Sequence, residues 1–163
     1  MKRIILTIVL LSSFLFAKEN LALNLQNEVY LLPKESKIVK EKIIKLISNS
    51  KSDIKIAMYN FSYKKFAKQL ASASKKGIKV KVLFDRSKIK KDDKIFKYLR
   101  ANNVETIVTK KKLHTKIAVF DSKIALVGSM NWTKESFKNN YEVIVFTKDN
   151  RVVSKLDNFI DKH

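Results

Sequence analysis

The chain has 163 residues, of which 45% are apolar and only 3 are glycine or proline (2 and 1), so it has the length and composition of one domain with a substantial core, not of a disordered or fibrous protein. The lack of cysteine excludes disulfides and thiol catalysis, and 2 histidines are too few for a multi-histidine metal site. The net charge of +20 favours a polyanionic partner, either nucleic acid or acidic lipid headgroups.

The first residues are typical of a secretory signal peptide. A basic start, M-K-R, precedes an uncharged and mostly apolar run at 4–17. This run is shorter than the roughly 20 apolar residues of a membrane-spanning helix. Leu15 is bulky for a position just before cleavage, so an uncleaved anchor is the alternative. We predict a signal peptide at 1–17, one domain at 18–163, and an exported protein that is periplasmic, envelope-associated or secreted. Membrane contact is expected only through the N-terminal segment.

Strand and helix patterns alternate from residue 27 onward. Alternating or continuous apolar runs predict strands, and apolar residues at helical spacing predict helices. The predicted strands are 28–32, 52–59, 78–84, 104–108 and 141–147, and the predicted helices are 35–50, 63–76, 92–102 and 150–162. The first two helices are expected to be crossovers between parallel strands. The predicted fold class is therefore α/β, with a mixed, mostly parallel β-sheet flanked by helices in one domain.

A β-hairpin is predicted where two short apolar runs, I-A-V-F and I-A-L-V, are joined by D-S-K. His114 and Lys116 stand before the first run. Ser129 and Asn131 follow the second. Because the outer ends of a hairpin meet, these four side chains should converge, and residues two apart should share a face. Asp121, in the link, should face the other way and hold the turn or the register of the hairpin.

The spacing of these residues resembles the signature of the phospholipase D superfamily. The pattern H-x-K-x4-D-x6-G-S-x-N is met at every position between His114 and Asn131. The segments N-W-T and M-Y-N-F-S, together with Glu142 in N-N-Y-E, are similar to the small bacterial endonuclease branch. The resemblance covers the α/β body from about residue 29 onward, with the core motif at 108–135, and implies a phospholipase D-like catalytic domain at 18–163.

The resemblance implies an enzyme that cleaves phosphodiesters without a metal or another cofactor. His114 would attack phosphorus and form a phosphohistidine. Lys116 and Asn131 would hold the phosphoryl oxygens. Ser129 would support the site by hydrogen bonds, and Glu142 would orient an imidazole and stabilise its charge.

A second histidine is also implied. In the superfamily, the acid that protonates the leaving group is the histidine of a second motif. This chain carries one motif, and His163 ends a predicted helix without a lysine two residues on, so it is a poor substitute. The resemblance therefore implies a homodimer with a composite active site at a two-fold interface. Which subunit supplies Glu142 to each His114 stays open.

Five further residues are candidates for contact with the substrate. Lys110, Lys111 and Lys112 are expected to grip flanking phosphates, and a solvated charge run is the alternative. Trp132 and Tyr59 are expected to stack on bases, and packing in the core or at the rim is the alternative for both.

Three functions follow from this site. An exported, metal-independent endonuclease acting on DNA and on RNA is favoured, because phosphate contacts carry affinity without sequence information. The first alternative is a phospholipase D that hydrolyses phospholipid headgroups, although only the N-terminal segment is apolar enough to enter an interface. The second alternative is an inactive nucleic-acid-binding protein of the envelope that aids DNA uptake.

Overall fold

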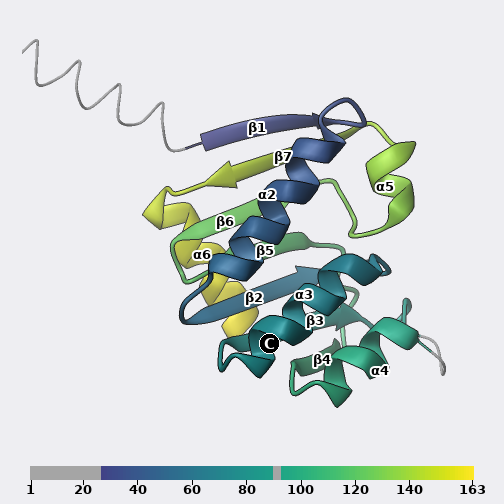
Figure 1. The fold of residues 1–163 in the computed structure, drawn as a ribbon, viewed down its shortest axis with the longest axis vertical. Coiled ribbons are helices and arrows are strands. Elements are labelled where there is room, and N and C mark those ends of the chain that lie inside the picture. The colour runs from purple at the N-terminus through teal and green to yellow at the C-terminus, as the bar shows by residue number, and fades with distance from the viewer. Residues whose placement is uncertain (1–26, 90–92) are drawn as a thin grey trace, which may run out of the picture.

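The computed structural model describes residues 27–89 and 93–163, so the predicted signal peptide lies outside the described residues. A seven-stranded sheet carries helices on both faces (Figure 1). The strands are β1 (Asn27–Leu32), β2 (Asp53–Met58), β3 (Lys79–Asp85), β4 (Glu105–Thr109), β5 (Lys116–Phe120), β6 (Ile124–Gly128) and β7 (Glu142–Thr147). The helices are α2 (Ser36–Asn49), α3 (Lys64–Lys75), α4 (Lys94–Ala101), α5 (Lys134–Lys138) and α6 (Asn150–Asp161). None of these helices has both the length and the apolar character that crossing a bilayer requires.

The strand order is β1-β7-β6-β5-β2-β3-β4. This confirms the predicted α/β class with a mixed sheet flanked by helices. Fewer strands pair in parallel than the predicted mostly parallel sheet implied. Parallel pairing is confined to β2, β3 and β4, and every other pairing of the described strands is antiparallel. The link of three residues between β5 and β6 leaves no room for the crossover that parallel strands need. Helix α2 connects the edge strand β1 to the inner strand β2, which is not its neighbour in the sheet. Helix α3 connects β2 to β3, which are neighbours and parallel.

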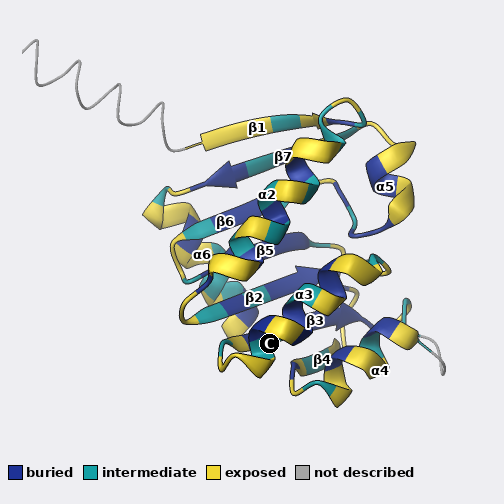
Figure 2. Ribbon diagram, viewed as in Figure 1, coloured by how far each residue is buried: buried dark blue, intermediate teal, exposed yellow. Residues whose placement is uncertain are grey.

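Two hydrophobic cores lie on opposite faces of the sheet. The side chains of Ala118 and Phe120 belong to the core under α2, α3 and α4. Those of Ile117 and Val119 belong to the core under α6. Burial on both faces explains why β5 is a continuous apolar run instead of an alternating one (Figure 2).

The hairpin is tied to the rest of the sheet at its turn. Asp121 has a positive φ of 53°, which the short polar side chain tolerates. Its carboxylate accepts hydrogen bonds from the backbone N–H groups of Lys51 at 2.9 Å and Ser52 at 2.8 Å. Burial alone would raise the pKa of Asp121, but these hydrogen bonds outweigh burial and lower it. The carboxylate therefore fastens the turn of the hairpin to the loop before β2, which agrees with the predicted role of Asp121 at the turn.

Every predicted strand and helix is present, with ends within two residues of the predicted bounds. The short helix α5 was not predicted. The side chain of Thr133 caps it by accepting a hydrogen bond from the backbone N–H of Ser136 at 3.1 Å. In the sequence, the only local sign of this helix was Thr133, a residue type that favours the start of a helix, and no apolar periodicity follows it.

Candidate active site

The motif residues gather at one edge of the sheet. There β5 begins with Lys116, β6 ends at Gly128 and β7 begins with Glu142. Because β5 is antiparallel to both β2 and β6, its first residue lies beside the last residues of those strands. This is also the carboxyl edge of the parallel strands, where open α/β sheets form their ligand-binding crevices.

His114 lies in the loop after β4, two residues before β5 begins, yet it meets Lys116 as predicted. The Nζ atom of Lys116 lies 3.4 Å from both ring nitrogens of His114. It also donates a hydrogen bond to the backbone oxygen of His114 at 2.9 Å. Lys116 is only 8% exposed, whereas His114 is exposed. The imidazole is therefore the more accessible of the two groups, and the ammonium lies next to it.

The electrostatics of this pair favour a neutral imidazole. The charge of Lys116, burial and the charge of Lys112 together lower the pKa of His114, and Asp85 opposes them. An imidazole that stays neutral near pH 7 can act as a nucleophile. Burial lowers the pKa of Lys116, and the charge of Glu142 partly offsets this effect.

Glu142 is held in place by its own chain. Its carboxylate accepts hydrogen bonds from the hydroxyl of Ser129 and, at 3.1 Å, from the side chain of Asn140. The same hydroxyl accepts a hydrogen bond from the backbone N–H of Val143 at 3.1 Å. A Cβ atom at Gly128 would lie 2.1 Å from the backbone oxygen of Val143, so only glycine allows β6 and β7 to approach this closely.

Asn131 reaches the site through the segment that follows β2. Its side-chain oxygen accepts a hydrogen bond from the backbone N–H of Asn60 at 3.2 Å. The backbone N–H of Tyr59 donates to the backbone oxygen of Thr115 at 2.9 Å. Residues 59 and 60 therefore bridge the two halves of the motif. Because the oxygen of Asn131 is the atom held by Asn60, its –NH2 group is the part that can donate to a ligand.

The two aromatic candidates have different positions. The ring of Tyr59 meets that of His114 edge-on, with 4.4 Å between the centroids. Trp132 is 0% exposed and packs against Phe61 and Phe66, with ring centroids 5.1 Å and 4.9 Å apart. The prediction that Trp132 stacks on bases is therefore wrong, because the core takes up its whole apolar surface.

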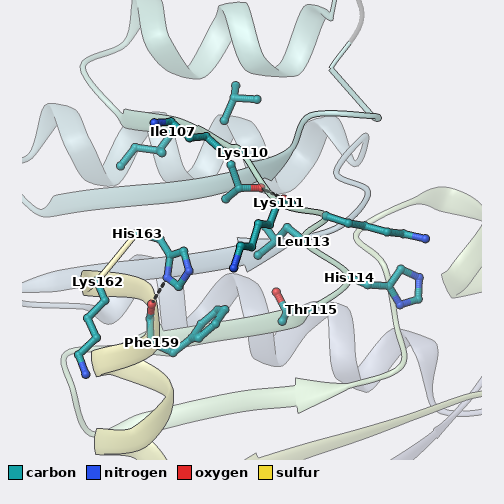
Figure 3. A pocket seen from close by; sticks show the side chains of 12 residues that line it. Ile107, Lys110, Lys111, Leu113, His114, Thr115, Phe159, Lys162 and His163 are labelled. Carbon is teal, nitrogen blue, oxygen red and sulfur yellow. Dashed lines mark hydrogen bonds between the residues drawn. The ribbon is translucent and has the colours of Figure 1, made fainter.

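The three consecutive lysines are exposed, as a phosphate-binding role requires. Lys110, Lys111 and Lys112 line a cavity of about 670 Å³ together with the end of α6 (Figure 3). Among the described residues, no three histidine, aspartate or glutamate side chains gather as a metal site would need.

Sequence reasoning missed Asp85, a fully buried carboxylate at the end of β3. It accepts hydrogen bonds from the backbone N–H groups of Leu113 at 2.5 Å and Ser87 at 2.8 Å. Burial would raise the pKa of Asp85, but the hydrogen bonds from Ser87 and Leu113 lower it. An aspartate directly after the apolar run V-L-F, at the carboxyl end of a strand, was the signal that could have identified it.

A mixed α/β sheet whose edge presents an exposed imidazole on a buried ammonium, beside a fixed carboxylate and amide, defines a phospholipase D-like domain. The chain belongs to this family: the family model described as "Cardiolipin synthase, PLD-like domain" matches residues 43–163.

Curated relatives include a phospholipase D of Rickettsia prowazekii, 28% identical over 123 residues, which are 74% of this chain and 60% of the relative. A mitochondrial cardiolipin hydrolase of Xenopus laevis is 26% identical over 124 residues, 75% and 59% of the two chains. The chain thus spans about three fifths of the length of these relatives.

Two solved structures share the fold. NucT from Helicobacter pylori superposes with a TM-score of 0.73 and 29% identity, over 84% of this chain and 94% of the other. Nuc from Salmonella typhimurium, a phospholipase D family member, gives a TM-score of 0.74 at 20% identity, over 83% and 91%.

Proposed function

We propose that this protein is an exported, metal-independent phosphodiesterase of the phospholipase D superfamily that cuts DNA, and also RNA, as a non-specific endonuclease. The observation that carries the proposal is the exposed imidazole of His114 with the ammonium of Lys116 at 3.4 Å from both ring nitrogens. The net charge of +20 supports a polyanionic substrate.

The reaction has two displacements at one phosphorus atom. In the first, a ring nitrogen of His114 forms a bond to phosphorus, the bond to the leaving oxygen breaks, and that oxygen takes a proton from a general acid. Lys116 and the –NH2 group of Asn131 stabilise the negative charge on the non-bridging oxygens. In the second, the group that gave the proton takes one from water, the water oxygen bonds to phosphorus, and the bond to His114 breaks.

The general acid is proposed to be His114 of a second copy of the chain. Within the described residues the only other histidine, His163, hydrogen-bonds to the backbone oxygen of Phe159 and lines the cavity at the end of α6. Its Nδ1 is therefore occupied by the end of its own helix. A two-fold axis beside the exposed edge of the site would place two imidazoles on opposite sides of one phosphate.

An exposed apolar surface next to Glu142 supports such a dimer. Leu31 and Val143 are paired across β1 and β7 on the side of the sheet opposite α2, and they are 59% and 43% exposed. Val29 on the same face is 59% exposed, and Tyr141, which precedes Glu142, is 95% exposed. Helix α6 packs on β2, β5 and β6, so this part of the sheet is uncovered (Figure 2). An apolar face of this kind, continuous with the site, suits a subunit interface.

Hydrolysis of phospholipids is the second candidate function, because relatives carry the names phospholipase D and cardiolipin hydrolase. The third candidate, an inactive nucleic-acid-binding protein of the envelope, has the positive charge in its favour. Nucleic acid is the preferred substrate because the lysines around the site outnumber what a single headgroup phosphate requires.

One experiment separates the three candidates. The purified protein is incubated in EDTA with plasmid DNA, with RNA, and with phospholipid vesicles, beside its His114→Ala variant. Cutting of DNA that persists in EDTA and disappears in the variant supports the endonuclease. Release of headgroups without cutting identifies a phospholipase, and retention of DNA without turnover identifies a binding protein. Fractionation of the source cells tests export.

A further inference from the structure

A cavity of about 670 Å³ lies beside the catalytic residues and is not used by the reaction described above. One wall is the loop between β4 and β5, and the other is the last turn of α6 (Figure 3). We call it the α6 pocket. His114 and Thr115 belong to its lining, so it opens directly onto the segment that carries the nucleophile.

The rim of the α6 pocket is cationic. Lys110, Lys111 and Lys112 stand on one wall, and Lys162 stands on the other. None of the described residues that line the pocket is an aspartate or a glutamate. Such a rim attracts more than one phosphate, because each lysine adds to the same field and no carboxylate cancels it.

The floor of the α6 pocket is apolar and includes two rings. Leu113 is buried in the core under α6, and Phe159 packs against that core. The ring of His163 lies 4.7 Å from the ring of Phe159, and its Nδ1 is 2.8 Å from the backbone oxygen of Phe159. The hydrogen bond holds the imidazole against the phenyl ring. A fixed pair of rings under a cationic rim is the arrangement by which proteins bind the bases of single strands.

Lys112 lies between the α6 pocket and His114. This lysine lines the α6 pocket, and it lies close enough to His114 for its charge to lower the pKa of the imidazole. A strand whose phosphate meets Lys112 therefore passes from the pocket to His114 without leaving the cationic surface.

We propose that the α6 pocket is a subsite for an unpaired nucleotide of the strand that is cut at His114. Its base stacks on the rings of Phe159 and His163, and its neighbouring phosphates bind the lysines of the rim. The face of a base inside a duplex is covered by its neighbours, so the subsite selects single-stranded nucleic acid. The inference rests on the proposed function and names the form of its substrate.

The test is equilibrium binding of a short oligonucleotide that carries one fluorescent aminopurine base, whose emission falls when the base stacks on a ring. Because the proposed nuclease needs no metal, the binding assay uses protein that carries His114→Ala, which prevents turnover. We expect this protein to quench the emission and to bind the single strand more tightly than the matching duplex. His163→Ala and Phe159→Leu should weaken binding of the single strand by about fivefold or more and restore the emission. Lys45→Gln, a change of an exposed lysine on α2 made in the same His114→Ala protein, should leave the binding unchanged.

Three results would overturn the subsite. The first is unchanged affinity in both variants, and the second is equal affinity for single strand and duplex. The third is binding of anionic phospholipid vesicles through the same two rings without competition between the vesicles and the single strand. If Phe159→Leu lowers the melting temperature, the test still rests on His163→Ala, because His163 is exposed and its replacement should not disturb the fold. The assay needs no turnover. Quenching without cutting by the wild-type protein would refute the proposed endonuclease and leave the subsite standing, and cutting without quenching would do the reverse.

Discussion

The carboxylate of Asp85 accepts a hydrogen bond from the backbone N–H of Leu113 at 2.5 Å, and Leu113 is the residue before His114. Asp85 is fully buried at the end of β3. His114, the proposed nucleophile, lies in a loop outside the strands, where no strand pairing holds the backbone. The charge-assisted hydrogen bond to Asp85 of β3 fixes this loop instead. Asp85 is thereby a positioning residue for His114.

Replacement of this carboxylate should cost activity more than binding. We expect Asp85→Asn to lower kcat by up to about 100-fold through misplacement of His114, with a smaller effect on KM. The measurement is steady-state cleavage of an oligonucleotide, with melting temperatures to confirm folding. Ser87→Ala, which removes the hydrogen bond from the Ser87 hydroxyl to Asp85 but leaves the bond from Leu113, is the matched control. Equal losses in both variants would contradict a specific role for the bond to Leu113.

The pH optimum should move in opposite directions when opposite charges near His114 are removed. The proposed composite site needs one neutral and one protonated imidazole, so activity should peak near the pKa of His114, which lies below its ordinary value of 6.5. Lys112→Gln removes a cation that lowers this pKa, so the optimum should rise. Asp85→Asn removes an anion that raises it, so the optimum should fall. Rate profiles from pH 4 to pH 8 (roughly the range in which imidazole titrates) decide the signs, and shifts in one common direction would refute this account.

The proposed dependence of activity on two imidazoles can be tested with mixtures of wild-type and variant chains. When wild-type and His114→Ala chains are mixed and allowed to exchange, the fraction of dimers with both imidazoles is the square of the wild-type fraction. Activity per wild-type chain should therefore halve when half of the chains are mutant. Constant activity per wild-type chain would mean that one chain holds a complete site. Light scattering on the same mixtures checks the oligomeric state.

The apolar surface beside Glu142 should be needed for assembly. We expect Leu31→Glu to give a folded monomer with little activity, because a charge in an apolar interface loses its hydration without gaining a partner. Leu31 is 59% exposed in the single chain, so the substitution should leave the fold intact. Ile38→Glu, at a residue that is 52% exposed on α2, is the matched control and should remain dimeric. Sizing by sedimentation distinguishes the two, and a dimeric, active Leu31→Glu protein would exclude this interface.

Asp121 should matter for stability more than for chemistry. Its carboxylate receives backbone hydrogen bonds from the loop before β2, far from the motif residues at the other end of the hairpin. Asp121→Ala should lower the free energy of unfolding by about 1–3 kcal/mol. Asp121→Asn should lower it less, since asparagine keeps one acceptor and tolerates the positive φ. Denaturant titrations give both values.

The same carboxylate gives a pH dependence of stability. Because folding lowers the pKa of Asp121 from its ordinary 3.8, its contribution is complete above that value and is lost as the pH falls through the lower, folded pKa. The difference in stability between wild type and Asp121→Ala should therefore shrink in acid below that range. A difference that is independent of pH would show that the charge of Asp121 plays no part.

The elements and the motif were predictable because they depend on local spacing. Alternation and helical periodicity gave the strands and helices, and the hairpin brought His114, Lys116 and Ser129 to one edge. The role of Asp85 was not predictable, because its hydrogen bond to Leu113 joins residues 28 positions apart, and no periodicity records such a contact. The burial of Trp132 depends likewise on Phe61 and Phe66, which are distant in the sequence.

Gly128 has no reactive atom, yet it sets the distance on which the site depends. The backbone of β7 occupies the space where any other residue would carry its Cβ atom, and this approach puts Ser129 within hydrogen-bonding reach of Glu142. A chain that kept every reactive residue but carried alanine at this position would retain the functional groups and lose their arrangement. A search that scores only the reactive positions of the motif would therefore accept sequences that cannot assemble this site.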